Sequence, residues 1–304
     1  MYRSTLFLSS VALAISGCGS TTTITPSATI APSTAASGYA TEASTFSDPD
    51  DTITRIAQMQ SMDWDTGTTS QKTVTFDVSA TGNTVNDHPE FLITYKGIAI
   101  TVAWDLVEER YEGTNGDIFV AFSTWYMTPN GQLTMSWANI SDDTVAQEGI
   151  WGLTLVGFNS DPDVVSGRTG TAEFTGWGGI NLNAEDNSFF TVLDGVATLA
   201  VNFDGDTITG SIDLTECVGC TQGAITITPT TMTLNEMSIA DNTFTGTASI
   251  DPADLGLSSI GTISVDGMFY EAGATAVGGY VSGVGAQDGT GETTFLNGAF
   301  IANE

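Results

Sequence analysis

The sequence predicts an all-β protein: a small antiparallel, handle-like domain followed by an eight-stranded up-and-down antiparallel β-barrel with a filled interior. Two observations predict it. Apolar and polar residues alternate with period two through almost the whole chain after residue 73, which is typical of strands with one buried face. Turn clusters such as "TNGD", "TPNG" and "DGD" separate these runs at short intervals, as in all-β barrels and sandwiches.

Residues 1–17 are predicted to be a lipoprotein signal peptide. One basic side chain precedes an apolar run at residues 6–15, which is too short to span a bilayer. The "ISGC" sequence that follows resembles the lipobox of bacterial lipoproteins, and this resemblance implies that Cys18 carries the lipid. An ordinary secretory signal that ends near a cysteine is the alternative. Gly19 after the cysteine resembles lipoproteins sent to an outer membrane.

Residues 18–47 are predicted to be the lipidated cysteine and a flexible tether. This segment is rich in Ser, Thr and Ala and has almost no large apolar residues, so it cannot bury a core of its own. A folded body held on such a tether stands away from the membrane surface.

Residues 48–165 are predicted to be the handle-like β domain with one short helix. The helix is expected at residues 51–62, where Asp50 and Asp51 can cap its start and Ile53 and Ile56 begin a helical stripe. The strands expected after it are residues 73–79, 91–95, 98–105, 117–127, 132–138 and 150–158.

Residues 166–304 are predicted to be the barrel. Its strands are expected at residues 171–177, 195–203, 207–214, 224–235, 243–250, 261–270, 276–285 and 293–302. Closure of eight short strands removes exposed sheet edges. One face of these strands is apolar and the other is polar, as at Thr243, Thr245 and Thr247. A polar outer face weighs against a membrane-spanning barrel, whose outside would be apolar.

A repeat in these strands places a large apolar residue and a glycine two positions apart, hence on the same face. The pairs are Phe174 and Gly176, Ile208 and Gly210, Phe244 and Gly246, Val265 and Gly267, Val277 and Gly279, and Leu296 and Gly298. Inward glycines make room for large neighbours in a narrow barrel, here predicted to be Phe174, Phe203, Phe244, Phe269 and Phe300. The sequence therefore predicts a filled interior, with no cavity for a ligand as large as a lipid.

The last strands resemble a known family. "SVDGMFYEAGATAVGGYVSGVG" followed by "FLNGAFIA" resembles the final hairpins of the barrel domain in the transferrin-binding protein B family of surface lipoproteins, and "SGRTGTAEFTG" resembles its barrel entry. The resemblance implies one lobe of that architecture, a lipid anchor and a binding role, with the handle domain supplying much of the partner-binding face. Glu271 stands where the family has a glycine, and the chain ends in Asn303-Glu304 instead of a basic segment.

Two cysteines remain once Cys18 is assigned to the lipid. Cys217 and Cys220 in "TECVGCTQ" are predicted to form a disulfide at a hairpin tip, since an exported compartment favours oxidation. A redox C-x-x-C normally opens a helix, and a metal site would need a second Cys or His pair. Both alternatives are therefore less favoured than a structural disulfide.

Charge and motifs limit the chemistry. The 304 residues include 36 acidic against 6 basic side chains, a formal charge of −30, so nucleic acid is excluded as a partner because it repels such a surface. Cationic ligands, divalent ions or a saline habitat fit this charge, as do solvated acids that only maintain solubility. No catalytic motif occurs, so no enzyme activity, cofactor, catalytic residue or metal site is predicted.

His88 in "TVNDHPEF" is interpreted as a surface residue of a proline-containing turn. The acidic turns "DPDD", "NSDPD" and "FDGDT" offer oxygen ligands but lack the spacing of a calcium loop.

Six tryptophans lie in or before the first barrel strand. Trp125 and Tyr126 adjoin the "TPNG" turn and are predicted ligand-binding anchors, with burial in the domain core as the alternative.

Together with the family resemblance, these sequence features predict an outer-membrane, surface-exposed, lipid-anchored binding protein. It would capture a protein or small solute, in iron- or metal-related uptake, for a membrane receptor of the TonB-dependent kind. The alternative is a structural or adhesive surface lipoprotein.

Overall fold

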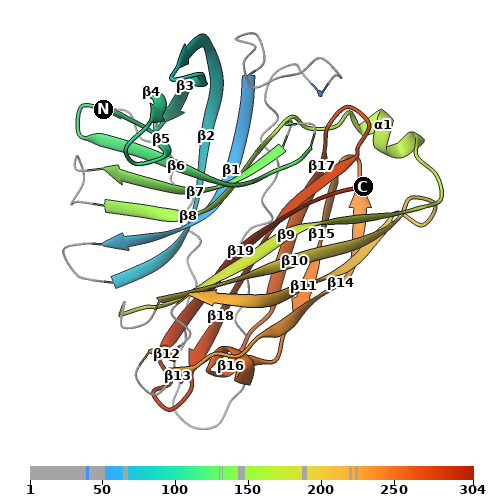
Figure 1. Ribbon diagram of the computed structural model, residues 1–304. Coiled ribbons are helices and arrows are strands. Elements are labelled where there is room, and N and C mark those ends of the chain that lie inside the picture. Colours follow the sequence, from blue (N-terminus) through green and yellow to red (C-terminus); the bar gives the residue numbers. More distant parts are fainter. Residues whose placement is uncertain are drawn as a thin grey trace.

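The computed structural model describes residues 39–40, 52–63, 68–129, 131, 133–142, 148–186, 190–218, 221–222 and 225–304. Strands form two barrels that lie side by side, the first in blue and green and the second in yellow to red (Figure 1). The predicted all-β class is confirmed, and so is the antiparallel arrangement.

The first barrel is closed and its strands follow one another in chain order. Each strand pairs antiparallel with the next, and β8 returns to β1 through the pairs from Gln60 with Trp151 to Asp63 with Glu148. The strands are β1 (Thr52–Asp63), β2 (Thr68–Val85), β3 (His88–Tyr95), β4 (Ile98–Asp105), β5 (Arg110–Asn115), β6 (Ile118–Met127), β7 (Leu133–Asp142) and β8 (Glu148–Gly157). The sequence predicts antiparallel strands here but not their closure.

The predicted helix at residues 51–62 is wrong. These residues form β1, which pairs with β2 along its whole length, from Thr52 with Ser79 to Asp63 with Thr68. The β-branched residues Thr52, Ile53, Thr54 and Ile56 favour a strand, and β1 also supplies the pairing that closes the barrel on β8. Pairing with two neighbours in the tertiary structure therefore prevails over the helical spacing of the apolar residues.

The second barrel consists of eight strands in chain order, each antiparallel to the next. They are β9 (Thr171–Ala184), β10 (Phe190–Asn202), β11 (Thr207–Val218), β14 (Thr230–Ala240), β15 (Thr243–Ser249), β17 (Ile263–Tyr270), β18 (Ala276–Gln287) and β19 (Thr293–Asn303). β19 pairs with both β18 and β9, which completes the ring. The predicted eight-stranded up-and-down barrel is confirmed.

Short elements lie in the connections between strands of the second barrel. The strands β12 (Thr221–Gln222) and β13 (Ile225–Thr226) pair with each other, and a 3-10 helix, η1 (Pro252–Leu255), precedes β16 (Leu257–Ile260), which pairs with β18. Leu255 and Leu257 are buried in the barrel core, so this connection closes one end of the second barrel.

The other end of the second barrel is covered by α1 (Pro162–Gly167) and the residue after it. Asp161 caps this helix by accepting a hydrogen bond from the Asp163 backbone N–H, and Val165 enters the barrel core. The Arg168 guanidinium lies 4.4 Å from the centre of the Phe203 ring. The sequence predicts a turn at "NSDPD" and does not predict the helix.

The interior of the second barrel is filled by the predicted phenylalanines. Phe174, Phe203, Phe244, Phe269 and Phe300 are all buried, and the Phe269 ring contacts three of the others. A Cβ on Gly279 would lie 2.6 Å from Cζ of Phe300, so the glycine leaves space that the ring occupies. The predicted filled interior is confirmed.

An apolar layer joins the two barrels. Leu133, Met135, Leu153 and Leu155 of the first barrel pack against five residues of the second, which are Tyr270, Ala276, Tyr280, Ala299 and Ile301. The Leu155 backbone N–H donates to the Tyr280 hydroxyl at 2.8 Å. Burial of these apolar side chains stabilises the contact between the two barrels.

The chain between the barrels is also held in place. The Ser160 N–H donates to the Phe269 carbonyl, and the Glu271 N–H donates to the Phe158 carbonyl. Of the predicted tether, the structure describes residues 39–40, and the Ala40 N–H donates to the Asn159 carbonyl at 2.7 Å. This point of the tether therefore contacts the folded body.

Candidate functional site

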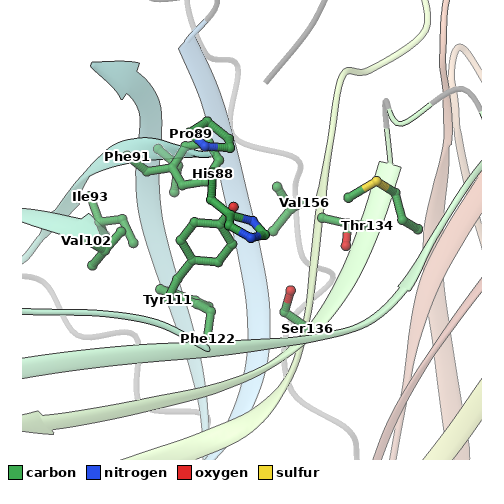
Figure 2. Close-up of a pocket in the computed structure, with 12 residues that line it drawn as sticks. His88, Pro89, Phe91, Ile93, Val102, Tyr111, Phe122, Thr134, Ser136 and Val156 are labelled. Carbon is green, nitrogen blue, oxygen red and sulfur yellow. The ribbon is translucent and has the colours of Figure 1, made fainter. Parts of the chain in front are cut away.

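The candidate site is a cavity of about 230 Å³ inside the first barrel (Figure 2). It lies at the end where the β2–β3, β4–β5 and β6–β7 hairpins turn. Its walls are formed by Val78, His88, Pro89, Phe91, Ile93, Val102, Tyr111, Phe122, Met127, Thr134, Ser136 and Val156. Met127 is half exposed, so the cavity reaches the surface at this end.

The alternation of side chains along the strands creates this lining. Phe91 and Ile93 are two positions apart on β3 and both line the cavity, and Thr134 and Ser136 do the same on β7. Towards the other end the same inward face carries Ile100, Ile118, Ile140 and Ile150, which are completely or almost completely buried. The cavity therefore ends on a packed core.

The contrast between the barrels explains why the cavity is in the first one. In the second barrel, Val165 and Leu255 enter the core from segments outside the barrel strands, whereas the described core of the first barrel contains strand residues alone. Side chains alone fill an eight-stranded barrel only where they are large enough to meet across it. At the open end Thr134 and Ser136 are small, so space remains.

Aromatic rings surround the mouth of the cavity. The rings of His88 and Trp104 are stacked, with centroids 4.3 Å apart and planes 16° apart. Tyr111 lies edge-on to Trp104 at 5.1 Å and to Phe91 at 5.2 Å. Figure 2 shows His88 near the centre of the lining, with Tyr111 and Phe122 below it. The rings fix one another, so the mouth is preorganised before any ligand arrives.

The interpretation of His88 as a surface residue of a turn is wrong. The turn consists of Asn86 and Asp87, both with positive φ (54° and 65°), which is the geometry of a tight hairpin. His88 therefore begins β3, is partly buried and lines the cavity. Stacking on Trp104 accounts for its orientation.

Apart from His88, the polar side chains of the wall are hydroxyls. The Thr134 and Ser136 hydroxyls lie in the wall and are buried. Burial raises the pKa of Tyr111 to about 12, so its phenol stays protonated over the physiological range. An apolar, water-excluding wall with a few hydroxyls binds and orients an apolar group. Within the described ranges, no group of three or more His, Cys, Asp or Glu is placed to hold a metal ion.

The sequence-predicted anchors lie near this site. Trp125 and Tyr126 are in β6, where a bulge interrupts the pairing with β7 between Thr124 and Tyr126. Their side chains are outside what the structure describes, so their binding role stays a prediction. Cys217 pairs with Leu193 near the end of β11, whereas Cys18 and Cys220 lie outside the described residues. The lipidation and the disulfide therefore also stay predictions.

Sequence reasoning missed the residues that make the cavity. The sequence pattern marks Phe91, Tyr111 and Phe122 as ordinary inward residues of strands. Alternation shows that a side chain faces the barrel interior, but it does not show whether side chains from other strands fill the space in front of it. One signal was present: Trp104 and Tyr111 are aromatic residues placed symmetrically about the "DLVEER" turn, and they are register partners. Aromatic cross-strand pairs at a strand end are a signal for a structured rim.

No helix in the described part of the chain is long and apolar enough to cross a membrane. No protein-family model and no curated protein matches the sequence.

Solved structures of similar architecture were found. Transferrin-binding protein B from Haemophilus parasuis Hp5, as a double mutant, is 14% identical with a TM-score of 0.48, over 82% of this chain and 45% of that one. The haemoglobin receptor HpuA from Kingella denitrificans is 14% identical with a TM-score of 0.40, over 84% of this chain and 88% of that one. Transferrin-binding protein B from Neisseria meningitidis serogroup B is 12% identical with a TM-score of 0.35, over 84% and 77%.

The family that the sequence resembles is thus among those found by structure. The chain spans less than half the length of the Haemophilus protein.

Proposed function

We propose that this protein is a binding protein and that the open end of its first barrel is the binding site. The observation that carries this is the cavity of about 230 Å³, which is lined mainly by apolar side chains and framed by stacked aromatic rings. Concave apolar sites with a few fixed polar groups are the usual form of small-molecule sites. Because the wall is mainly apolar, we propose binding and not catalysis.

The cellular setting that we propose follows from the sequence. The predicted lipidation at Cys18, the predicted tether and the resemblance to surface lipoproteins support an outer-membrane, cell-surface location. In this setting the protein captures a protein or small solute, in iron- or metal-related uptake, and delivers it to a TonB-dependent receptor. Trp125 and Tyr126, at the β6 bulge close to the open end, are the anchors that we propose for this capture.

The test of the site uses a neutral apolar probe, 1-methylnaphthalene, titrated into the purified full chain by calorimetry. Ser136→Phe places a ring in the cavity, because Ser136 is in its wall and buried. The matched control is Thr101→Phe, which adds the same ring at an exposed position of the same barrel. We expect saturable binding by the wild type and by the control, and at least about tenfold weaker binding by Ser136→Phe.

A second variant, Ser136→Leu, keeps the test valid should the larger residue prevent folding, and circular dichroism with a thermal midpoint verifies each fold. The site is refuted if the probe binds none of these proteins saturably, or binds all of them equally.

The capture role needs a separate experiment. A soluble fragment that starts at residue 48 serves as bait for proteins and solutes from the growth medium, beside the full chain. We expect one saturable partner whose recovery falls on Trp125→Ala. Recovery of no saturable partner, with adhesion of cells intact, would instead support the alternative function, a structural or adhesive surface lipoprotein.

A further inference from the structure

We propose that the cavity of the first barrel takes a small organic cation, with its apolar body inside the barrel and its positively charged amine at the aromatic and acidic rim. This inference rests on the proposed binding function and adds the chemical class of the ligand. It follows from three properties of the site: the size of the cavity, the rings at its mouth, and the charge of the two hairpins that carry those rings.

The cavity has room for a compact apolar group. An apolar protein cavity of about 150 Å³ is known to hold benzene, so the volume of about 230 Å³ found here suits one or two fused rings or a short branched chain. The wall around this space offers side chains such as Phe91, Ile93 and Val102, which favour an apolar occupant.

The rim offers π-systems to a positive charge. A cation within about 6 Å of a Trp or Tyr ring face is attracted by the ring quadrupole, and a group of rings recognises an ammonium group most strongly. Trp104, which has one face stacked on His88, stands nearly perpendicular to Tyr111, at 74°, so the two rings present surfaces in two directions. Because the pKa of Tyr111 is about 12, its ring stays a neutral phenol.

The charge around these rings has one dominant sign. The β2–β3 segment 86–90 and the β4–β5 segment 104–112 carry six carboxyl groups, which are Asp87, Glu90, Asp105, Glu108, Glu109 and Glu112, against one arginine. Arg110 is itself bound to Glu112 at 3.0 Å and lies 3.8 Å from Glu108. The charge of the rim is therefore strongly negative, which concentrates cations at the mouth.

Two of these carboxylates are held in the ionised form. Hydrogen bonds from the Glu108 and Val107 backbone N–H groups hold the pKa of Asp105 below its ordinary value. Hydrogen bonds from Asn83 and Thr81 do the same for the pKa of Glu90. Lys96 is placed at the opposite end of the barrel, in the β3–β4 turn, and pairs with Asp142 at 2.6 Å.

The experiment compares three probes that share one apolar body. These are 1-naphthylmethylamine, 1-methylnaphthalene and the carboxylate of 1-naphthaleneacetic acid (the acetate probe), which are cationic, neutral and anionic at pH 7. Calorimetry on the full chain at low salt should show the amine binding about tenfold more tightly than the neutral probe, and the acetate more weakly than both. Raising the salt to about 1 M, where the Debye length is about 3 Å, should remove most of this preference.

Variants separate the rim from the general charge of the protein. The triple variant Asp87→Asn, Glu108→Gln, Glu109→Gln should reduce the preference for the amine several-fold and leave the neutral probe unaffected. The matched control removes three exposed acids of the second barrel, by Glu173→Gln, Asp213→Asn and Glu216→Gln, and should keep the preference. Tyr111→Leu should weaken amine binding more than Tyr111→Phe, which keeps the ring.

The outcomes distinguish this inference from the proposed function. Equal binding of all three probes would overturn the cation proposal while the binding site stands. No saturable binding of any probe would overturn both. Leu106 and Val107 at the β4–β5 tip are exposed and offer contact to a larger partner. If the blocked peptide acetyl-Lys-Phe-Lys-amide binds more tightly than the amine and Val107→Ser abolishes this gain, the occupant is a basic protein segment and the small-molecule proposal is wrong.

Discussion

The ring of Phe244 on β15 lies over Gly267, its register partner on β17. Phe300 on β19 lies over Gly279 on β18 in the same way, and Gly267 and Gly279 are themselves partners. The two phenyl rings thus approach each other across a pair of glycines, with centroids 6.3 Å apart. The repeat of large residue and glycine is a packing device, because each glycine provides the space that a ring from a neighbouring strand fills.

Gly267→Ala should destabilise the protein by about 1–3 kcal/mol, since the added Cβ would lie 2.5 Å from Cε2 of Phe244 and 2.7 Å from the Gly278 carbonyl oxygen. Urea unfolding measures this change. Gly167→Ala is the matched control, because a Cβ there meets nothing within 4 Å. Adding Phe244→Leu to Gly267→Ala should recover part of the loss. Equal unfolding midpoints for Gly267→Ala and the wild type would contradict this packing.

Glu271→Ala should destabilise the protein by about 2–3 kcal/mol, because the buried carboxylate accepts hydrogen bonds from Thr128 at 2.6 Å and from Thr275 at 2.7 Å. Thr128 belongs to the first barrel, so this carboxylate also ties the two barrels together. Glu271 has a φ of 70°, so Glu271→Gly should cost about 1 kcal/mol less than Glu271→Ala. Guanidinium unfolding of both variants tests this order, and the reverse order would refute it.

Two asparagines between the barrels should respond differently to the same substitution. Asn181 is fully buried and neither polar atom of its side chain has a hydrogen-bond partner among the described residues. In Asn297, its register partner, only Nδ2 lacks such a partner, because Oδ1 accepts a bond from Gln71. Asn181→Leu should therefore be neutral or stabilising, by up to about 2 kcal/mol, because it removes a buried polar group without a partner. Asn297→Leu should destabilise, since it leaves the Gln71 amide without its acceptor.

Thermal midpoints compare the two asparagine variants. A loss of stability with Asn181→Leu as large as with Asn297→Leu would contradict this prediction.

Two aspartates should give pH dependences of opposite sign. Burial raises the pKa of Asp266 above its ordinary value of 3.8, so its contribution to stability is full below that value and is lost as pH rises. Backbone N–H bonds lower the pKa of Asp105, so its contribution is present above 3.8 and is lost as pH falls. At pH 7, Asp266→Asn should raise the thermal midpoint and Asp105→Asn should lower it, and both effects should shrink at pH 3. Effects of the same sign at pH 7 would rule this out.

Local pattern predicted the second barrel well because its strands are separated by clear turns and its inward positions are marked by glycine. The predicted segment 276–285 lies inside β18, for example, and Phe244 and Phe300 are buried as expected. The helix expected at residues 51–62 failed because spacing within one segment cannot show that two other strands pair with it. The sequence predicts a turn at "NSDPD", residues 159–163, and not the helix at residues 162–167, because so short a helix gives no period.

The candidate site was the least predictable part. Trp125 and Tyr126 drew attention because they are large and adjoin a turn, but the cavity depends on what the inward side chains leave unfilled. Thr134 and Ser136 leave space only because no segment like α1 covers their end of the described first barrel. Such an empty space depends on several strands that are distant in the chain, so the sequence of any one strand does not predict it.

By itself the sequence determined the all-β class, the antiparallel strands and the filling of the second barrel, because alternation and the glycine repeat are local properties of each strand. It also set the strongly negative charge. Tertiary structure alone decided that β1 is a strand, that the first barrel closes on itself, and that one of its ends holds an apolar cavity framed by His88, Trp104 and Tyr111. Closure and vacancy arise from pairing and packing between distant segments, and those contacts exist only once the chain is folded.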